Sequence, residues 1–137
     1  MSATPVADSR IEQIVAACEN ATIEAADFDH EAHILVGWWY LQERSVLDAL
    51  SRFTGALRRL TRKLGMPSKY HETITWFYVI QIAGRCRGTA DVEWPQFKAA
   101  NADLFAQNPS LIEKYYSESL LSSETARRLF VFPDLRP

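Results

Sequence analysis

Apolar residues recur three and four positions apart in several stretches of the chain, which is the spacing of one helix face. The first of these stretches covers about residues 9–20, and a later one covers 45–64. Between them, residues 29–42 are apolar nearly all round after the first turn. So little polar surface is typical of a helix in a protein interior. The pattern therefore predicts that 29–42 is a central, mostly buried helix.

Further helical segments are predicted at about 69–87, from 94 to before 108, at 110–121, and in a last turn through 128. Gly65 and Pro67 are expected to end the helix before them, since neither residue continues a helix well. Residues 1–8 read as a loose leader. The tail 129–137 is too apolar for a free linker and is expected to pack on the bundle. The sequence thus predicts one all-α domain, a helical bundle of about five to six helices.

Composition narrows the class of protein. The chain has 137 residues, of which 47% are hydrophobic and 23% charged, and its formal net charge is −2. These values are ordinary for a globular protein, and they give no global reason to expect nucleic acid, which needs a concentrated positive field. No segment has the length of a membrane span or the apolar core of a signal peptide. We expect a cytoplasmic protein with no membrane or nucleic-acid partner, in which Cys18 is a buried free thiol.

Basic residues gather near the end of the segment 45–64. They oppose the negative end of the helix dipole there, so a solvated face is the simpler interpretation. An anion-binding patch is the alternative, and the sequence leaves open whether the cluster has a partner. Its members are Arg58, Arg59, Arg62 and Lys63.

All three histidines lie in two short segments, Phe28 to His33 and Lys69 to Thr73, each at the start of an apolar helix. His30 and His33 are three residues apart and therefore share a helix face. Gly37 lies one turn further on, where a missing side chain lets another helix approach closely. The helix that follows His71 is the expected neighbour.

Imidazole nitrogens together with a carboxylate suit Zn²⁺, Fe²⁺ or Mn²⁺, and helical bundles build such sites from inward-facing side chains. The predicted metal ligands are His30, His33, His71 and Glu72. The predicted catalytic residues are His33, His71 and Glu72, with the metal polarising a substrate oxygen or activating water. A metal-free acid–base or ligand site is an alternative. So is a hydrogen-bonded structural set, in which His30 caps the helix or is exposed, His33 bonds Tyr70 or Thr73, and His71 lies at the surface.

A small-molecule substrate or ligand is expected at this site. Tyr70 and Thr75 are candidates to position it, Trp38 to form an aromatic wall, and Arg85 or Arg127 to hold a carboxylate. Tyr78 lies on the same predicted stripe as His71 and completes the candidate set. The opposing hypothesis is a non-catalytic ligand-binding or protein-interaction module, such as a homodimer, whose histidines are structural.

The two histidine segments, together with Trp38 to Leu41 and the ending from Ala126 to Asp134, resemble a family of small uncharacterised bacterial helical proteins. The similarity covers most of the chain and implies an all-helical fold without adding a reaction. A looser architectural likeness connects the chain with DinB-like bundles, which hold a metal with three histidines. The histidine spacing differs from theirs, and fold likeness alone does not carry function.

Overall fold

The computed structural model describes residues 6–86 and 92–136, and these residues form helices and connections without a strand. The all-α prediction is confirmed. Within these two ranges the seven α-helices are α1 (Val6–Glu19), α2 (His30–Leu41), α3 (Val46–Lys63), α4 (Glu72–Cys86), α5 (Trp94–Ala100), α6 (Glu118–Leu121) and α7 (Glu124–Arg128). The same described residues include four short 3₁₀ helices in the connections: η1 (Ala25–Asp27), η2 (Pro67–Lys69), η3 (Ala102–Phe105) and η4 (Leu111–Lys114).

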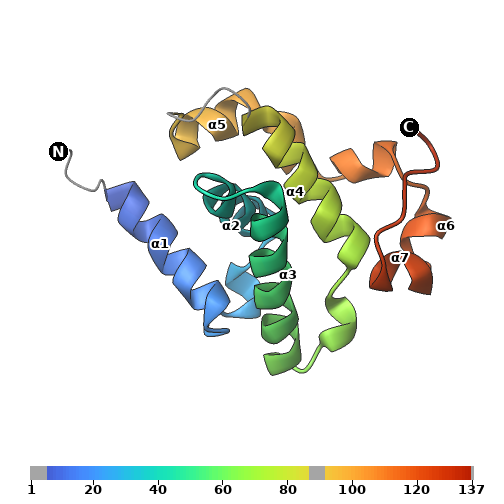
Figure 1. Cartoon of the computed structure of the whole chain (residues 1–137), viewed down its shortest axis with the longest axis horizontal. Coiled ribbons are helices and arrows are strands. Elements are labelled where there is room, and N and C mark those ends of the chain that lie inside the picture. The colour runs from blue at the N-terminus through green and yellow to red at the C-terminus, as the bar shows by residue number, and fades with distance from the viewer. Residues whose placement is uncertain (1–5, 87–91, 137) are drawn as a thin grey trace.

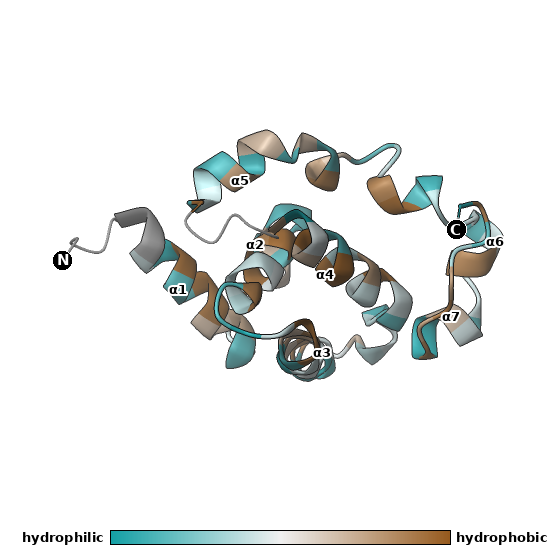
Figure 2. Ribbon diagram, turned by 45° about the horizontal axis from the view of Figure 1, so that its top comes forward, coloured by the Kyte–Doolittle hydropathy of each residue, from teal (hydrophilic) through white to brown (hydrophobic). Residues whose placement is uncertain are grey.

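Helix α2 is the centre of the molecule, as its apolar sequence predicts. It packs against α1, α3 and α4 (Figure 1), and seven of its twelve residues are buried. Figure 2 shows hydrophobic positions on α2 and α4 in the middle of the fold, while hydrophilic positions are common on the peripheral α1 and α5. A helix that lacks a polar face is stable in water only when neighbours cover it on every side.

Local signals fix where the central helices begin and end. The Asp29 carboxylate accepts the Ala32 backbone N–H at 2.9 Å, and the Ser45 hydroxyl accepts the Asp48 N–H at 3.1 Å. Both are N-caps that satisfy a donor left free by the first helical turn. Gly65 ends α3 with a φ of 74°, a left-handed conformation that costs glycine little.

Gly37 of α2 faces side chains of both α3 and α4. A Cβ built on it would lie 3.3 Å from Ile82 Cδ1 of α4 and 3.5 Å from Phe53 Cε2 of α3. The distance to Phe53 is an ordinary contact, but the distance to Ile82 is shorter than most, so Ile82 occupies part of the space that a side chain at this position would need. The predicted close approach of α4 is therefore present in the structure.

Several predicted boundaries differ from those of the structure. Helix α1 begins at Val6, so only residues 1–5 of the predicted leader remain, and they lie outside the described residues. The helix predicted from residue 69 begins at Glu72, because Pro67–Lys69 form η2. The segment predicted as one helix over 110–121 is divided into η4 and α6, with the extended backbone of Ser117 between them. Similarly, Asn101 leaves the helical region and separates α5 from η3.

The C-terminal segment lies along α6, α7 and the first half of α4. The Leu135 N–H donates to the Tyr115 carbonyl at 2.9 Å, and the Tyr116 hydroxyl donates to the Val131 carbonyl at 2.6 Å. The rings of Trp76 and Phe130 stack with their centroids 5.1 Å apart. These contacts hold an apolar tail against the helices, which is the placement that its composition predicts.

Buried Thr73 joins this segment to α4. Its hydroxyl lies 2.6 Å from the Ala126 carbonyl and 2.8 Å from the Leu129 carbonyl, and it accepts the Val131 N–H at 3.2 Å. The hydroxyl has one proton, which the two carbonyls share, and its lone pair takes the Val131 N–H, so Thr73 contacts backbone groups on three residues of the tail and of α7. His71 makes a similar contact with the carbonyl of Leu121, at the end of α6. We call the hydrogen bonds of Thr73 and His71 with α6, α7 and the tail the tail clasp.

Candidate functional site

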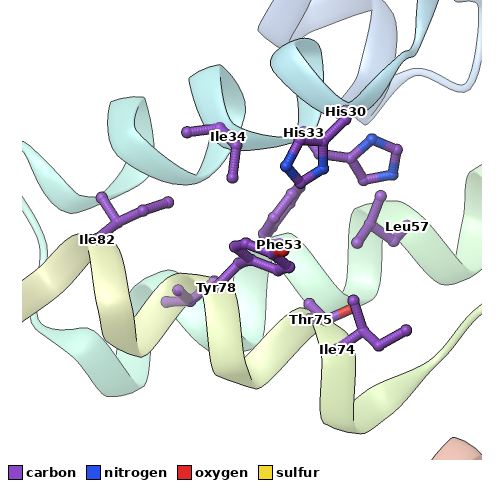
Figure 3. A pocket seen from close by; sticks show the side chains of 10 residues that line it. His30, His33, Ile34, Phe53, Leu57, Ile74, Thr75, Tyr78 and Ile82 are labelled. Carbon is purple, nitrogen blue, oxygen red and sulfur yellow. The ribbon is translucent and has the colours of Figure 1, made fainter. Parts of the chain in front are cut away.

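A cavity of about 280 Å³ lies between α2, α3 and α4. Figure 3 shows two imidazoles from α2 together at one end of it and Ile82 of α4 toward the other. Most of the lining is apolar, so the few polar groups decide what the cavity can bind. The lining residues are His30, His33, Ile34, Phe53, Leu57, Ile74, Thr75, Tyr78, Val79 and Ile82.

His33 is held by the residues that begin its own helix. Its Nδ1 lies 2.8 Å from the Asp29 carbonyl, which can only accept, so Nδ1 carries the hydrogen. The ring also stacks on Phe28, with centroids 4.0 Å apart. Nε2 is thereby left as an acceptor, and it has no hydrogen-bond partner in the part of the chain that the structure describes.

The surroundings of His33 keep its imidazole neutral. Burial lowers the pKa of His33 below its ordinary value of 6.5, because a charged ring loses hydration there. The Asp29 carbonyl opposes this effect by stabilising the charged ring, and the nearby His30 adds to the lowering. The result is a basic nitrogen that keeps its lone pair near neutral pH.

His30 is oriented by η3. Its Nε2 donates to the Leu104 carbonyl at 2.8 Å, and its ring meets the edge of Tyr78 with centroids 5.1 Å apart. Nδ1 is again left as the acceptor when the ring is neutral. The i, i+3 spacing predicted that His30 and His33 share a face, and both do line the cavity.

The two hydroxyl residues of the cavity come from α4. The Thr75 hydroxyl donates to the His71 carbonyl at 2.8 Å, so it can only accept from a ligand. The Tyr78 hydroxyl is buried; Ser110 and Ile112 are close enough to lower its pKa, but neither reaches it in good hydrogen-bond geometry. Burial outweighs both and raises the pKa of Tyr78. Thr75, His30 and His33 can therefore each accept a hydrogen bond from a bound ligand.

His71, the third histidine, lies in the tail clasp and does not line the cavity. Its Nε2 donates to the Leu121 carbonyl at 2.7 Å, while Nδ1 accepts the Ile74 backbone N–H at 3.2 Å. The second bond makes His71 the cap of α4. Because both nitrogens are engaged, a metal or substrate could bind this ring only after one of these bonds was broken.

Glu72 is also engaged elsewhere. Its Oε1 accepts from the Tyr70 hydroxyl and forms an ion pair with Arg58 at 3.0 Å. Tyr70 lines a surface groove and not the cavity, although Thr75 lies close enough to influence its pKa. The structure thus places Glu72 and Tyr70 in a separate polar network.

Two other predicted substrate-binding residues lie away from the cavity. Trp38 is buried against Trp94 and Phe97, with ring centroids 5.3 and 6.2 Å away. Arg85 holds Asp103 of η3 through Nη2 at 2.8 Å, and this contact lowers the pKa of Asp103. Among the candidates from the sequence, the structure brings together His30, His33, Thr75 and Tyr78.

The predicted metal ligands do not form one coordination set. Among the residues that the structure describes, no group of three or more His, Cys, Asp or Glu side chains is arranged to hold a metal ion. His30 and His33 each have one nitrogen left, but His71 and Glu72 are bonded elsewhere. Two imidazoles alone fall short of the three or four protein ligands that hold zinc.

Sequence reasoning did not assign the apolar lining to the site. Phe53 and Leu57 belong to the predicted stripe of α3, and Ile82 lies on the α4 stripe that includes Tyr78. The signal was therefore present as amphipathic periodicity. Periodicity identifies a face that is buried, but it does not show that the packed faces leave a cavity.

Comparisons with known proteins add no relative. No protein-family model, curated protein or solved structure matches the chain. Within the described residues, no helix is long and apolar enough to cross a membrane. The resemblance given above, the expected small-molecule partner, the absence of a nucleic-acid partner and the homodimer stay predictions.

Proposed function

We propose that the protein binds a small, mainly apolar and uncharged molecule in the cavity between α2, α3 and α4, and that His33 accepts a hydrogen bond from it. The observation that supports this proposal is the Nε2 lone pair of His33, which is free in a cavity with apolar walls. His33 is half-buried, and the apolar walls around this nitrogen limit its hydration, so a ligand that donates to it gains a hydrogen bond at little cost in lost hydration.

The size of the cavity limits the ligand. A cavity of roughly 150 Å³ in another protein holds one benzene molecule. By that measure, a volume of about 280 Å³ suits one or two fused rings with about ten non-hydrogen atoms. This is below the usual range of drug-sized pockets.

Charge limits the ligand further. Among the residues that the structure describes, no lysine or arginine lines the cavity, and the lowered pKa of His33 keeps that ring uncharged near neutral pH. A carboxylate or phosphate would lose its hydration here without gaining a cation. A neutral hydroxyl or N–H donor matches the acceptors that the cavity presents.

The same nitrogen can also act chemically. An imidazole whose other nitrogen is held by a backbone carbonyl can take a proton from a bound hydroxyl, which is general-base catalysis. His33 meets the geometric requirement through Asp29. Binding and general-base catalysis would both use the Nε2 atom of His33 in the same orientation.

Two nearly isosteric probes test the proposal. Indole carries an N–H donor and indene does not, although both have nine non-hydrogen atoms. We expect both to bind saturably in a heteronuclear NMR titration, with indole about fivefold tighter, which corresponds to one net hydrogen bond. The shifted resonances should belong to the cavity residues.

Variants then assign the preference to one atom. His33→Phe retains a ring to stack on Phe28 but cannot accept, so the preference for indole should disappear. His71→Gln is the matched control, because His71 does not line the cavity, and the preference should remain. Absence of saturable binding by either probe, or a preference that persists in His33→Phe, would contradict the proposal.

A further inference from the structure

A surface groove of about 450 Å³ lies between η2, α7 and the side of α3, and Tyr70 is part of its lining. Figure 1 shows that these elements meet at the end of the molecule opposite α1. The groove is polar where the cavity is apolar, and arginines from distant parts of the chain converge on it. Its lining residues are Arg58, Pro67, Ser68, Tyr70, Glu124, Arg127 and Arg128.

Arg127 carries a positive charge that no carboxylate neutralises within the described residues. Its Nη1 donates to the Ser68 carbonyl at 3.1 Å, which fixes the guanidinium against η2. Its Nε is buried and has no hydrogen-bond partner in the part of the chain that is described. A partly buried cation in this state is unfavourable unless an anion approaches it.

The other two arginines add to this field. Arg128 is exposed and forms no ion pair in the described part of the chain. On the opposite wall, Arg58 is fixed by Glu72 at 3.0 Å and lies over the Tyr70 ring, 5.0 Å from its centroid. Among the described lining residues, Glu124 is the one acidic side chain. Because Glu72 already neutralises Arg58, Arg127 and Arg128 supply the positive charge in excess, and Arg58 supplies further N–H donors.

We propose that this groove binds a small phosphate-bearing molecule through Arg127, Arg128 and Arg58. Guanidinium groups present paired N–H donors that match phosphate oxygens. A phosphate dianion has several oxygens and can accept hydrogen bonds from both walls of the groove at once. The two oxygens of a planar carboxylate are already matched by the paired N–H groups of one guanidinium. The proposal concerns a second site and does not depend on the cavity, whose ligand is uncharged.

Inorganic phosphate is the probe for the first test. In an NMR titration at constant ionic strength, phosphate should produce saturable shifts of the Arg127 Nε–Hε resonance and of the backbone amides of Ser68 and Arg128. Chloride at the same ionic strength should not produce them. Shifts that rise without saturation, or that chloride reproduces, would overturn the proposal, because they report general screening.

Charge-matched variants provide the second test. We expect Arg127→Gln to weaken the apparent affinity for phosphate about tenfold, the loss of one charged hydrogen bond. Arg128→Gln should weaken it about threefold without a change in stability, because this exposed side chain forms no hydrogen bond or ion pair with the described residues. Its result therefore counts even where Arg127→Gln disturbs folding.

Arg10→Gln is the control, since it removes the same charge from exposed α1 at the other end of the molecule. It should leave phosphate binding unchanged. Equal weakening in all three variants would overturn the proposal in favour of a non-specific effect of net charge. Indole binding should be unaffected by any of them, so failure at the groove and failure at the cavity are distinguishable.

Discussion

The starts of α2 and α4 look alike in sequence and differ in what they offer a ligand. Each has a histidine followed by a glutamate at the beginning of an apolar helix: His30-Glu31 in one and His71-Glu72 in the other. At α2, His30 and His33 each keep one acceptor nitrogen and line a cavity. At α4, both nitrogens of His71 are bonded, and Glu72 pairs with Arg58.

The difference comes from what covers each helix start. The tail clasp joins α6, α7 and the tail to the beginning of α4, where His71 and Thr73 bond to backbone carbonyls of these elements. Beside His33, the described residues leave a cavity instead. A histidine is therefore available for binding only where its neighbours leave it an unused nitrogen, and residue type alone does not reveal this.

The largest expected effect comes from breaking the tail clasp. Thr73→Val preserves shape but leaves the carbonyls of Ala126 and Leu129 and the Val131 N–H without their partner. Each unsatisfied buried group costs about 1–3 kcal/mol, so we expect the free energy of unfolding to fall by about 3 kcal/mol in urea denaturation. Amides of the tail should also exchange faster with solvent.

Thr75→Val is the matched control for this prediction. It removes the single hydroxyl contact with the His71 carbonyl, so the loss should be about 1 kcal/mol, and tail protection should be retained. An equal loss in both variants would show that the clasp contributes nothing beyond one ordinary hydrogen bond.

A smaller effect is expected from a pair of glycine substitutions. Gly37→Ala should gain up to about 1 kcal/mol of helix propensity, but its Cβ displaces Ile82, whose flexible end borders the cavity. We expect little net change in stability and severalfold weaker binding of indole, because Ile82 moves into the space that the ligand needs. Calorimetric binding and urea denaturation measure the two quantities separately.

Gly84→Ala provides the comparison, since nothing lies within 4 Å of a Cβ at that exposed position. It should stabilise the protein by about 0.5–1 kcal/mol and leave indole binding unchanged. Equal affinity for indole in the two glycine variants would show that the contact between Gly37 and Ile82 does not influence binding in the cavity.

The smallest effect is expected from pH, and it acts on both helix starts. Burial lowers the pKa of His33 and of His71 below 6.5, and at His71 the charge of Arg127 adds to the lowering. As pH falls below about 6.5, the unfolded chain binds protons before the folded one does. The stabilising contribution is thus complete above that pH and declines until the pKa of the folded state is passed.

Urea denaturation at several pH values between about 7.5 and 5.5 measures this slope, and His33→Gln and His71→Gln should each reduce it. Ligand binding separates the two histidines. Protonation of His33 removes the acceptor, so indole should bind more weakly at the acid end, and this dependence should survive in His71→Gln but vanish in His33→Gln. A pH-independent affinity in the wild-type protein would argue against His33 as the acceptor.

Much of the fold could be predicted because its signals are local. The all-round apolar sequence of α2, the caps at Asp29 and Ser45, and the stop at Gly65 depend on residues within a turn or two of one another. Cys18 is buried, as its position on the apolar stripe of α1 predicts, and burial raises the pKa of its thiol to about 12. The division of 110–121 was missed because Ser117 caps α6 within a stretch that otherwise keeps helical spacing.

The candidate site was only half predictable for the same reason. The spacing of His30 and His33 guarantees a shared face, so their meeting was readable from the sequence. Whether His71 joins them depends on Leu121, fifty residues away, whose carbonyl takes its Nε2 hydrogen. Likewise, Arg127 and Arg58 meet at the groove only because the C-terminal segment folds back against η2.

The sequence by itself determined which segments are helical, which helix lies at the centre, and which residues share a face, since periodicity and caps act along one helix. The tertiary structure alone decided which polar atoms remain unpaired, where the packed faces leave a cavity, and which charges go without a counterion. Those outcomes depend on contacts between residues distant in the chain, whose geometry is set by the packing of whole helices.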